Sequence, residues 1–285
     1  MRLLVFCLTF IPKNMFSYVV GVLVRIELPK VLQVCVNNIF VRFAKINMTE
    51  AQKPLKEYSS LEELFTRKLR KNVRTFAGRV CSPCDGILQA SHRIHDQNQV
   101  MQAKGMYYSV TELILGKKGQ TIPGFNPGWY SNIYLSPKHY HRVHCPIDAY
   151  LKSITHIRGD LWPVNLAFVK HVPNLFTRNE RVVFELETSQ GGLVYVVMVG
   201  ALNVGRIETV CGTSLVSNTP CEGRKEKVRK IMMEEKTRVR QGDELGVFRL
   251  GSTTIVVFDE SVVNESPLKD VKEVTSVLLG ESLEV

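Results

Sequence analysis

The chain has 285 residues, of which 45% are hydrophobic and 22% are charged. This composition excludes a disordered chain, and the length allows one large domain or two small ones with a sizeable core. The formal net charge is +10. It favours an anionic partner such as nucleic acid, anionic lipid or a phosphorylated substrate, without choosing among them.

The first 46 residues are unusually apolar. Segments 3–12 and 14–24 carry no charge, but each is shorter than the roughly 20 residues that span a bilayer. No clear signal-peptide cleavage site follows them. Apolar residues then recur at helical spacing, which predicts an amphipathic helix over residues 30–46 with Leu32, Val36, Ile39, Phe43 and Ile46 on its apolar face.

Basic residues flank this apolar face. Up to residue 46 they outnumber the single acid, Glu27, and they are Arg2, Lys13, Arg25, Lys30, Arg42 and Lys45. An apolar face with basic flanks is typical of a helix that lies on an anionic membrane surface. We therefore expect residues 1–75 to form a helical membrane-association segment. The alternative is a helix that packs against its own domain.

A short helix is predicted next, at residues 60–71, because Ser60 and Glu63 fit a capping box. From about residue 78 the sequence becomes β-rich, with glycine and proline between short apolar runs. Gly191 and Gly192 are predicted to form a hairpin turn between two strands. The runs predicted as strands lie at 133–135, 182–186, 193–199 and 253–258.

These elements predict an α+β fold with a β-rich body, sandwich-like or barrel-like, over residues 76–285. The charged segment 224–240 carries both signs and is interpreted as solvated surface. The basic residues are dispersed, and no helix-turn-helix, zinc-finger or aromatic β-platform pattern accompanies them. Nucleic acid is therefore not expected as a partner.

The seven cysteines are an odd number, which suits a reducing compartment better than a disulfide framework. Cys81 and Cys84 have the spacing of a redox or zinc motif. A second such pair, which a four-thiolate zinc site needs, is absent. Buried or incidental thiols are the favoured interpretation, and a redox or metal role is the alternative.

Three histidines lie close together, at His139, His141 and His144. Histidine titrates near neutral pH, so it can transfer protons or bind a metal. In a strand, His139 and His141 would share a face while His144 would point away, and a three-histidine metal site would need a bend. Proton transfer or substrate contact is favoured, and no metal is predicted. A structural or surface role is the alternative.

The pair Gly251-Ser252 interrupts a strand-like run. It is either a turn or a peptide bond that the protein cuts itself. In the second case the Ser252 hydroxyl attacks the Gly251 carbonyl, a histidine takes the proton, and an aspartate orients the histidine. The ester that results could eliminate to dehydroalanine and then give a pyruvoyl group. Asp85 is a candidate for the acid, although an aspartate before glycine is more often a turn residue.

Together these segments resemble the phosphatidylserine decarboxylases of the bacterial and mitochondrial type. The resemblance runs from about residue 45 to residue 258, and more loosely over the N-terminal helices. It is carried by AQKP at 51–54, SPCDG at 82–86, QAKG at 102–105, YHRVH at 140–144, RGDLWPVN at 158–165, VPNLFTRNERV at 172–182, VGALNVGRIETV at 199–210 and LGST at 250–253.

The resemblance implies that Asp85, His144 and Ser252 form a self-cleavage triad within a pyruvoyl decarboxylase domain. Cleavage between Gly251 and Ser252 would give a β chain, 1–251, and an α chain, 252–285, that starts with a pyruvoyl group made from Ser252. This covalent pyruvate cofactor would form a Schiff base with the amine of phosphatidylserine. Loss of carbon dioxide would then lead to phosphatidylethanolamine.

Further roles follow from the same resemblance. His144 would supply the proton to the product, and His141 would lie in the substrate site. No fixed role is implied for His139 or Cys145. The two chains would stay together as a heterodimer, and heterodimers could pair into a larger dimer.

The predicted substrate also fits the charge and the apolar N-terminus, because a phospholipid is not easily extracted from its bilayer. The single cysteines and the lack of secretory features predict a peripheral position on the cytoplasmic face of a bacterial inner membrane. A mitochondrial form would be expected to carry a longer leader.

Three other hypotheses stay open. A pyruvoyl decarboxylase of a soluble amino acid would use the same chemistry without an apolar N-terminus. An unprocessed lipid-binding relative would remain one intact chain. A Ser-His-Asp hydrolase would use Ser252 as a free nucleophile, although this serine is not in a G-x-S-x-G elbow.

Overall fold

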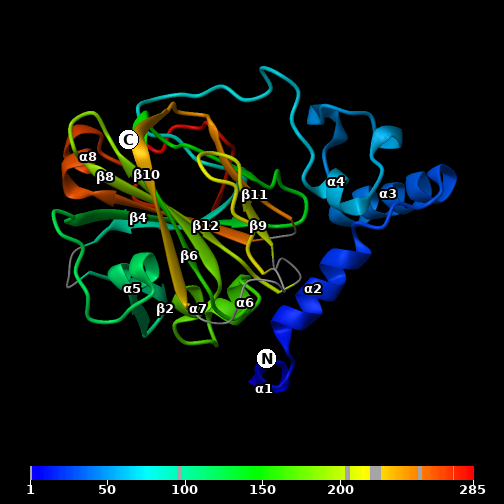
Figure 1. The fold of residues 1–285 in the computed structure, drawn as a ribbon, viewed down its shortest axis with the longest axis horizontal. Helices are drawn as coiled ribbons and strands as arrows, with labels where there is room; N and C mark the ends of the chain where they lie inside the picture. The colour runs from blue at the N-terminus through cyan, green and yellow to red at the C-terminus, as the bar shows by residue number, and fades with distance from the viewer. Residues whose placement is uncertain (1, 95–97, 203–205, 219–225, 250–251, 272) are drawn as a thin grey trace.

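A computed structural model describes residues 2–94, 98–202, 206–218, 226–249, 252–271 and 273–285 (Figure 1). Within these ranges, the side chains of residues 2–4 and 234–236 are not described. Figure 1 shows the N-terminal helices gathered at one side of a strand-rich body. This arrangement confirms the predicted α+β class.

One large antiparallel sheet forms the centre of the body. Among the described residues it has eight strands, in the order β10-β6-β7-β8-β12-β4-β1-β13. Strand β12 lies between β8 and β4, and every one of its residues is buried. The bounds are β1 Gly86–Arg93, β4 Pro127–Leu135, β6 Ala149–Ile157, β7 Arg181–Glu187, β8 Leu193–Val199, β10 Val228–Val239, β12 Ser252–Asp259 and β13 Thr275–Val277.

Smaller elements surround this sheet. Strands β5 (Arg142–His144), β11 (Glu244–Phe248) and β9 (Ile207–Thr209) form a second sheet, and β2 (Gln99–Ala103) pairs with β3 (Met106–Ser109). The short helices of the body are α5 Val110–Leu115, α6 Leu166–Val169, α7 Leu175–Arg178 and α8 Glu260–Glu265.

The four predicted strands are confirmed within β4, β7, β8 and β12. The predicted hairpin turn is confirmed as well, because Gly191 has a φ of +86° and the Thr188 N–H donates to the Gly192 carbonyl. Strand β10 was not predicted. It pairs with β6 at the end of the large sheet, and its many charged residues hide the alternation by which a strand is recognised.

The N-terminal part contains α1 (Arg2–Thr9), α2 (Lys13–Leu23), α3 (Lys30–Ala44) and α4 (Leu61–Phe65), with the one-turn 3₁₀ helices η1 (Met48–Glu50) and η2 (Leu55–Glu57) before α4. No helix within the described residues combines the length and the apolar character that crossing a bilayer requires.

Helix α4 begins where it was predicted but ends at Phe65 rather than at residue 71. The Ser60 hydroxyl accepts from the Glu63 N–H at 3.1 Å, which confirms the N-cap. The helix stops because residues 68–70 pair with residues 50–52 in an extended bridge. Those backbone hydrogen bonds replace the ones that further helical turns would make.

Helices α2 and α3 bury polar side chains and expose apolar ones. In α3, Asn37 is fully buried and donates to the Tyr58 carbonyl at 3.0 Å, whereas Val31 and Phe43 are 87% and 86% exposed. In α2, Ser17 is buried while Met15 is 64% exposed. Helix α3 packs on η2 and α4, but it buries polar side chains there, the reverse of the usual amphipathic pattern. Membrane contact of its exposed apolar face stays a prediction.

Candidate active site

Ser252 is the first residue of β12, at the end of a strand in the middle of the large sheet. Its backbone lies opposite Leu135 of β4. The side chain is 1% exposed, and its hydroxyl has no hydrogen-bond partner among the described residues. The predicted cleavage site also includes Gly251, which lies outside the described residues. The geometry of the bond between these two residues is therefore not part of the structure.

Ser252 faces a cavity of about 300 Å³. Its walls come from both parts of the chain, because α2, α3 and α4 supply apolar side chains to it. The residues around it are Val20, Val24, Phe40, Phe65, Tyr134, Leu135, Pro137, Pro163, Val164, Asn165, Ala201, Leu202 and Ser252. A cavity of this kind accepts a molecule with an apolar body and a polar group that reaches the serine.

His144 belongs to β5 and is held as a neutral base. Its Nδ1 lies 2.7 Å from the Gly242 carbonyl, which can only accept, so Nδ1 carries the proton. Its Nε2 is then the basic nitrogen, and it accepts from the Tyr140 hydroxyl at 3.1 Å. Burial lowers the pKa of His144 below its usual value, although the Gly242 hydrogen bond and the charge of Glu244 oppose this effect.

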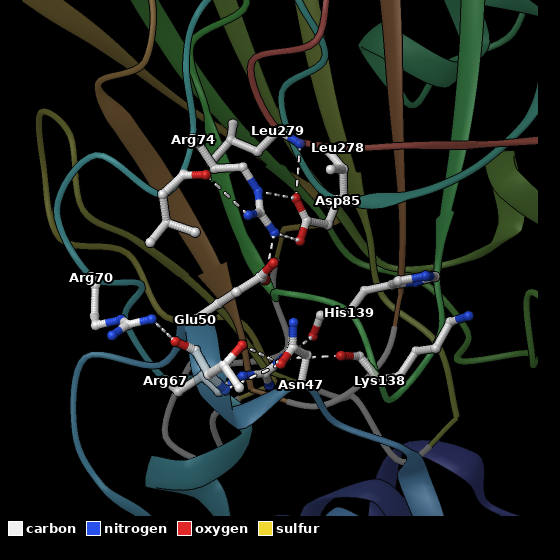
Figure 2. A network of polar contacts seen from close by, with 12 residues as sticks. Asn47, Glu50, Arg67, Arg70, Arg74, Asp85, Lys138, His139, Leu278 and Leu279 are labelled. Atoms are coloured by element: carbon white, nitrogen blue, oxygen red, sulfur yellow. Dashed lines mark hydrogen bonds and ion pairs between the residues drawn. The ribbon is translucent and has the colours of Figure 1, made fainter.

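Asp85 follows the segment 82–84 at the start of β1 and is bound by an arginine (Figure 2). Arg74 donates to both of its carboxylate oxygens, at 3.0 Å and 2.6 Å, and the Leu279 N–H donates to Oδ1 at 2.8 Å. The same guanidinium reaches Glu50 at 2.9 Å. The Asp85 carboxylate is thus buried with a bidentate cation, and its charge raises the pKa of His144 from a distance.

The structure brings the three predicted segments together. The His144 N–H donates to the Pro83 carbonyl at 2.8 Å, and β4 pairs both with β1, which follows Asp85, and with β12, which starts at Ser252. Within the described residues, however, no hydrogen bond joins the side chains of Asp85, His144 and Ser252. The triad stays a prediction, and its members have other partners, or none, among the described residues.

His141 and His139 differ in their surroundings. His141 is completely buried, its ring lies 3.9 Å from that of Phe65, and neither ring nitrogen has a hydrogen-bond partner in the described part of the chain. Burial places its pKa well below the usual value. His139 accepts from the Ser136 N–H at 2.9 Å, and burial lowers its pKa to about 4. Both rings are neutral at physiological pH.

Cys81 and Cys84 are buried free thiols, which agrees with the favoured interpretation of this pair. Burial raises the pKa of Cys81 to about 12 and that of Cys84 still further, so neither is a ready thiolate. Within the described residues, no three histidine, cysteine or acidic side chains come together as a metal site.

Sequence reasoning missed Arg74 and Gly242, which bind Asp85 and His144. Neither lies in a recognisable motif, so no local signal could have found them. Tyr140 belongs to the quoted segment 140–144, but nothing in the sequence pointed to its contact with His144.

Comparison with known proteins gives one consistent answer. The family model for phosphatidylserine decarboxylase matches residues 61–284. The phosphatidylserine decarboxylase proenzyme of Methylobacillus flagellatus is 40% identical over 225 residues, or 78% of each chain. That of Coxiella burnetii is 36% identical over 263 residues, or 90% of each chain. That of Pseudoalteromonas translucida is 37% identical over 262 residues, or 87% of this chain and 86% of the relative.

These matches define the class of protein, a pyruvoyl-dependent carboxy-lyase of phospholipid biosynthesis that is made as a proenzyme. The chain belongs to the phosphatidylserine decarboxylase family. The predicted family and the predicted class of enzyme are both confirmed.

Proposed function

We propose that this protein cuts its own chain between Gly251 and Ser252 and then decarboxylates phosphatidylserine to phosphatidylethanolamine at position 252. The observation that carries the proposal is the place of Ser252. This buried serine starts a central strand and faces a cavity to which the N-terminal helices contribute apolar side chains. A phospholipid needs such an arrangement, because its polar head must reach the reacting group while its tails stay in an apolar phase.

In the cleavage step, the Ser252 hydroxyl is the nucleophile and His144 is the base. The Ser252 hydroxyl has no competing partner among the described residues. The unprotonated nitrogen of His144 is Nε2, and its lone pair can take up a proton. To accept the serine proton, the imidazole must exchange its Tyr140 contact for the serine hydroxyl. Asp85 stabilises the imidazolium that forms, since its negative charge favours the protonated ring.

The residues around position 252 fit a pyruvoyl group made from that serine. Such a group supplies an electron-withdrawing carbonyl that binds the substrate amine and accepts the electrons left by carbon dioxide. Strand β12 is hydrogen-bonded to β4 and β8 on its two sides and keeps this position in place. Most side chains around the cavity are apolar, which favours the acyl part of a lipid there over water. His144 would return the proton to the product, and His141 lies behind Phe65, which forms part of the cavity wall.

The protein would bind peripherally to an anionic membrane through α2 and α3. Both helices expose apolar side chains over a large part of their length, including Met15, Val31, Ile39 and Phe43. The net charge of +10 draws the molecule to an anionic surface. We place this surface on the cytoplasmic side of a bacterial inner membrane, with the two cleaved chains held together as a heterodimer.

An intact-mass spectrum of the purified protein tests the cleavage. We expect two chains divided at Gly251–Ser252, with a pyruvoyl group at the start of the short one. Ser252→Ala, His144→Ala and Asp85→Ala should each remain one chain. Ser131→Ala is the matched control, because Ser131 is a buried serine of the same sheet, and it should still be cut. A cleaved Ser252→Ala chain would remove Ser252 from the mechanism.

Release of carbon dioxide from phosphatidylserine in vesicles, compared with free serine, then tests the substrate. A cut protein that prefers free serine would support the decarboxylase of a soluble amino acid. An uncut wild-type chain without activity would support the lipid-binding relative. An uncut chain that is inactivated by serine-directed acylating reagents would support the hydrolase.

A further inference from the structure

A second cavity, of about 260 Å³, lies beside the end of α4. It shares no lining residue with the cavity at Ser252. Two of its residues, Gln52 and Lys53, come from the segment AQKP, to which the proposed reaction gives no role. The complete lining is Gln52, Lys53, Tyr58, Glu63, Thr66, Arg67, Lys68 and Arg142.

Arg67 is the unusual member of this lining, because its charge is buried and only partly satisfied. The residue is 4% exposed. Its Nη2 donates to the carbonyls of Lys138 and His139, at 2.9 Å and 3.2 Å (Figure 2). Its Nε and Nη1 are buried and have no hydrogen-bond partner in the described part of the chain. Native proteins rarely leave buried N–H groups of a cation in this state.

No acid of the described residues neutralises Arg67. Asp85 and Glu50 attract it from a distance, but both are bound to Arg74, as Figure 2 shows. Glu63, the acid in the cavity wall, is paired with Lys53 at 2.6 Å. Burial accordingly lowers the pKa of Arg67. A buried cation without a counterion is costly, and an anion in the cavity would remove this cost.

The other cations of the lining indicate which anion fits. Lys53 is paired with Glu63, and Arg142 with Glu244 at 2.6 Å. This leaves Arg67 and Lys68 without an acid partner among the described residues, and both border the same space. Two positive charges beside free N–H donors match a phosphate group, which carries up to two negative charges and several acceptor oxygens.

We propose that the cavity at Arg67 binds a phosphate-class anion, either the phosphate of a membrane lipid or free inorganic phosphate, at a site separate from Ser252. Arg67 would bind the anion through Nε and Nη1 while Nη2 stays on residues 138 and 139. Those residues lead directly to Tyr140, His141 and His144. An anion in the cavity would therefore hold in place the segment that carries the histidines of the active site.

The test uses the full-length Ser252→Ala chain, so that neither cleavage nor turnover affects binding. Inorganic phosphate is titrated into it by calorimetry, and vesicles of phosphatidylcholine are compared with and without phosphatidic acid. We expect Arg67→Gln to weaken binding at least about tenfold, the loss typical of one charge-assisted interaction. Arg70→Gln is the matched control, because it removes the same charge from an exposed residue outside the cavity.

A second matched pair keeps the test decisive if Arg67→Gln fails to fold. Lys68 is exposed and borders the cavity, while Lys71 is exposed and does not. Lys68→Gln should weaken binding severalfold and Lys71→Gln should not. Saturable binding of inorganic phosphate that follows this pattern identifies free phosphate as a ligand. If the cavity variants differ from their controls only in binding to vesicles with phosphatidic acid, the anion is the phosphate of a lipid. Cavity and control variants that behave alike with both probes overturn the proposal, whatever the outcome of the decarboxylation assay.

Discussion

The ion pair between Arg74 and Asp85 gives the most quantitative prediction. Arg74→Gln should destabilise the folded chain strongly, because it leaves the Asp85 carboxylate buried without its cation. The two side chains are only 8% and 6% exposed, and two hydrogen bonds join them. After the substitution, Asp85 would keep only the N–H of Leu279 among its present partners in the described residues.

The magnitude follows from this burial. Removing one partner of a buried pair costs about 3–5 kcal/mol. Because Glu50, the second acid on Arg74, is 31% exposed, its contact adds at most about 1 kcal/mol. We therefore expect a loss of roughly 3–6 kcal/mol for Arg74→Gln. Asp85→Asn should cost less, about 1–2 kcal/mol, since Arg74 still has Glu50. The double variant should be more stable than the sum of the single losses implies.

Urea unfolding of the uncut Ser252→Ala chain, followed by tryptophan fluorescence, measures these differences. Arg79→Gln is the control, because Arg79 pairs with Glu265 at an exposed site and should lose less than about 1 kcal/mol. A loss below 1 kcal/mol for Arg74→Gln would refute the reasoning, as would strictly additive losses in the double variant. Either result would mean that water reaches Asp85 and replaces the arginine.

Three further predictions concern pH and the membrane. Cleavage should be constant above about pH 6.5 and slow in acid, because neutral His144 is the base and its pKa is lowered. Tyr140→Phe should move the loss of cleavage rate in acid to higher pH, since the tyrosine hydroxyl favours the neutral His144 ring. An unshifted pH profile would contradict a hydrogen bond between Tyr140 and His144. The pKa of buried His141 is lower in the folded chain than in the unfolded chain, so the unfolded chain takes up the proton first as the pH falls. His141 should therefore lower the free energy of unfolding by about 1.4 kcal/mol per pH unit below pH 6.5. A smaller slope in His141→Leu, measured by urea unfolding, checks this. Phe43→Asp should weaken vesicle binding roughly 10- to 100-fold in a sedimentation assay, whereas Tyr107→Asp, at an exposed site on β3, should not. Equal binding by both variants would move the membrane contact away from α3.

The reacting residues could be predicted from the sequence because each lies in a short segment with recognisable chemistry. Their partners could not. Arg74 lies 11 residues from Asp85, in a loop without a pattern, and Gly242 lies 98 residues from His144. Hydrogen bonds between distant segments depend on how the sheets pack together, and the spacing of residues within one segment does not predict that. The same limit applies to Arg67, because the sequence does not reveal that two of its nitrogens are buried without a hydrogen-bond partner among the described residues.

Helix α3 shows a different limit. The period of its apolar residues was enough to predict the helix, but the period alone does not say which face points inward. The direction follows from Gln33 and Asn37, which are buried and bond to each other at 2.8 Å, while Asn37 also donates to the Tyr58 carbonyl. Because the polar face of α3 points inward, its apolar face stays uncovered by the rest of the described chain and is free to contact an apolar phase. For a family that acts on a phospholipid, the simplest such phase is the bilayer.

This orientation also connects the predicted membrane contact with the chemistry. Phe40 of α3 lies 6.4 Å from Phe65 of α4, and Phe65 lies 3.9 Å from His141, measured between ring centres. Phe40 and Phe65 both line the cavity at Ser252. The helix that would rest on the lipid surface is therefore one aromatic residue away from His141, the histidine that we propose for the substrate site. A shift of α3 on the membrane would therefore move a wall of the cavity itself.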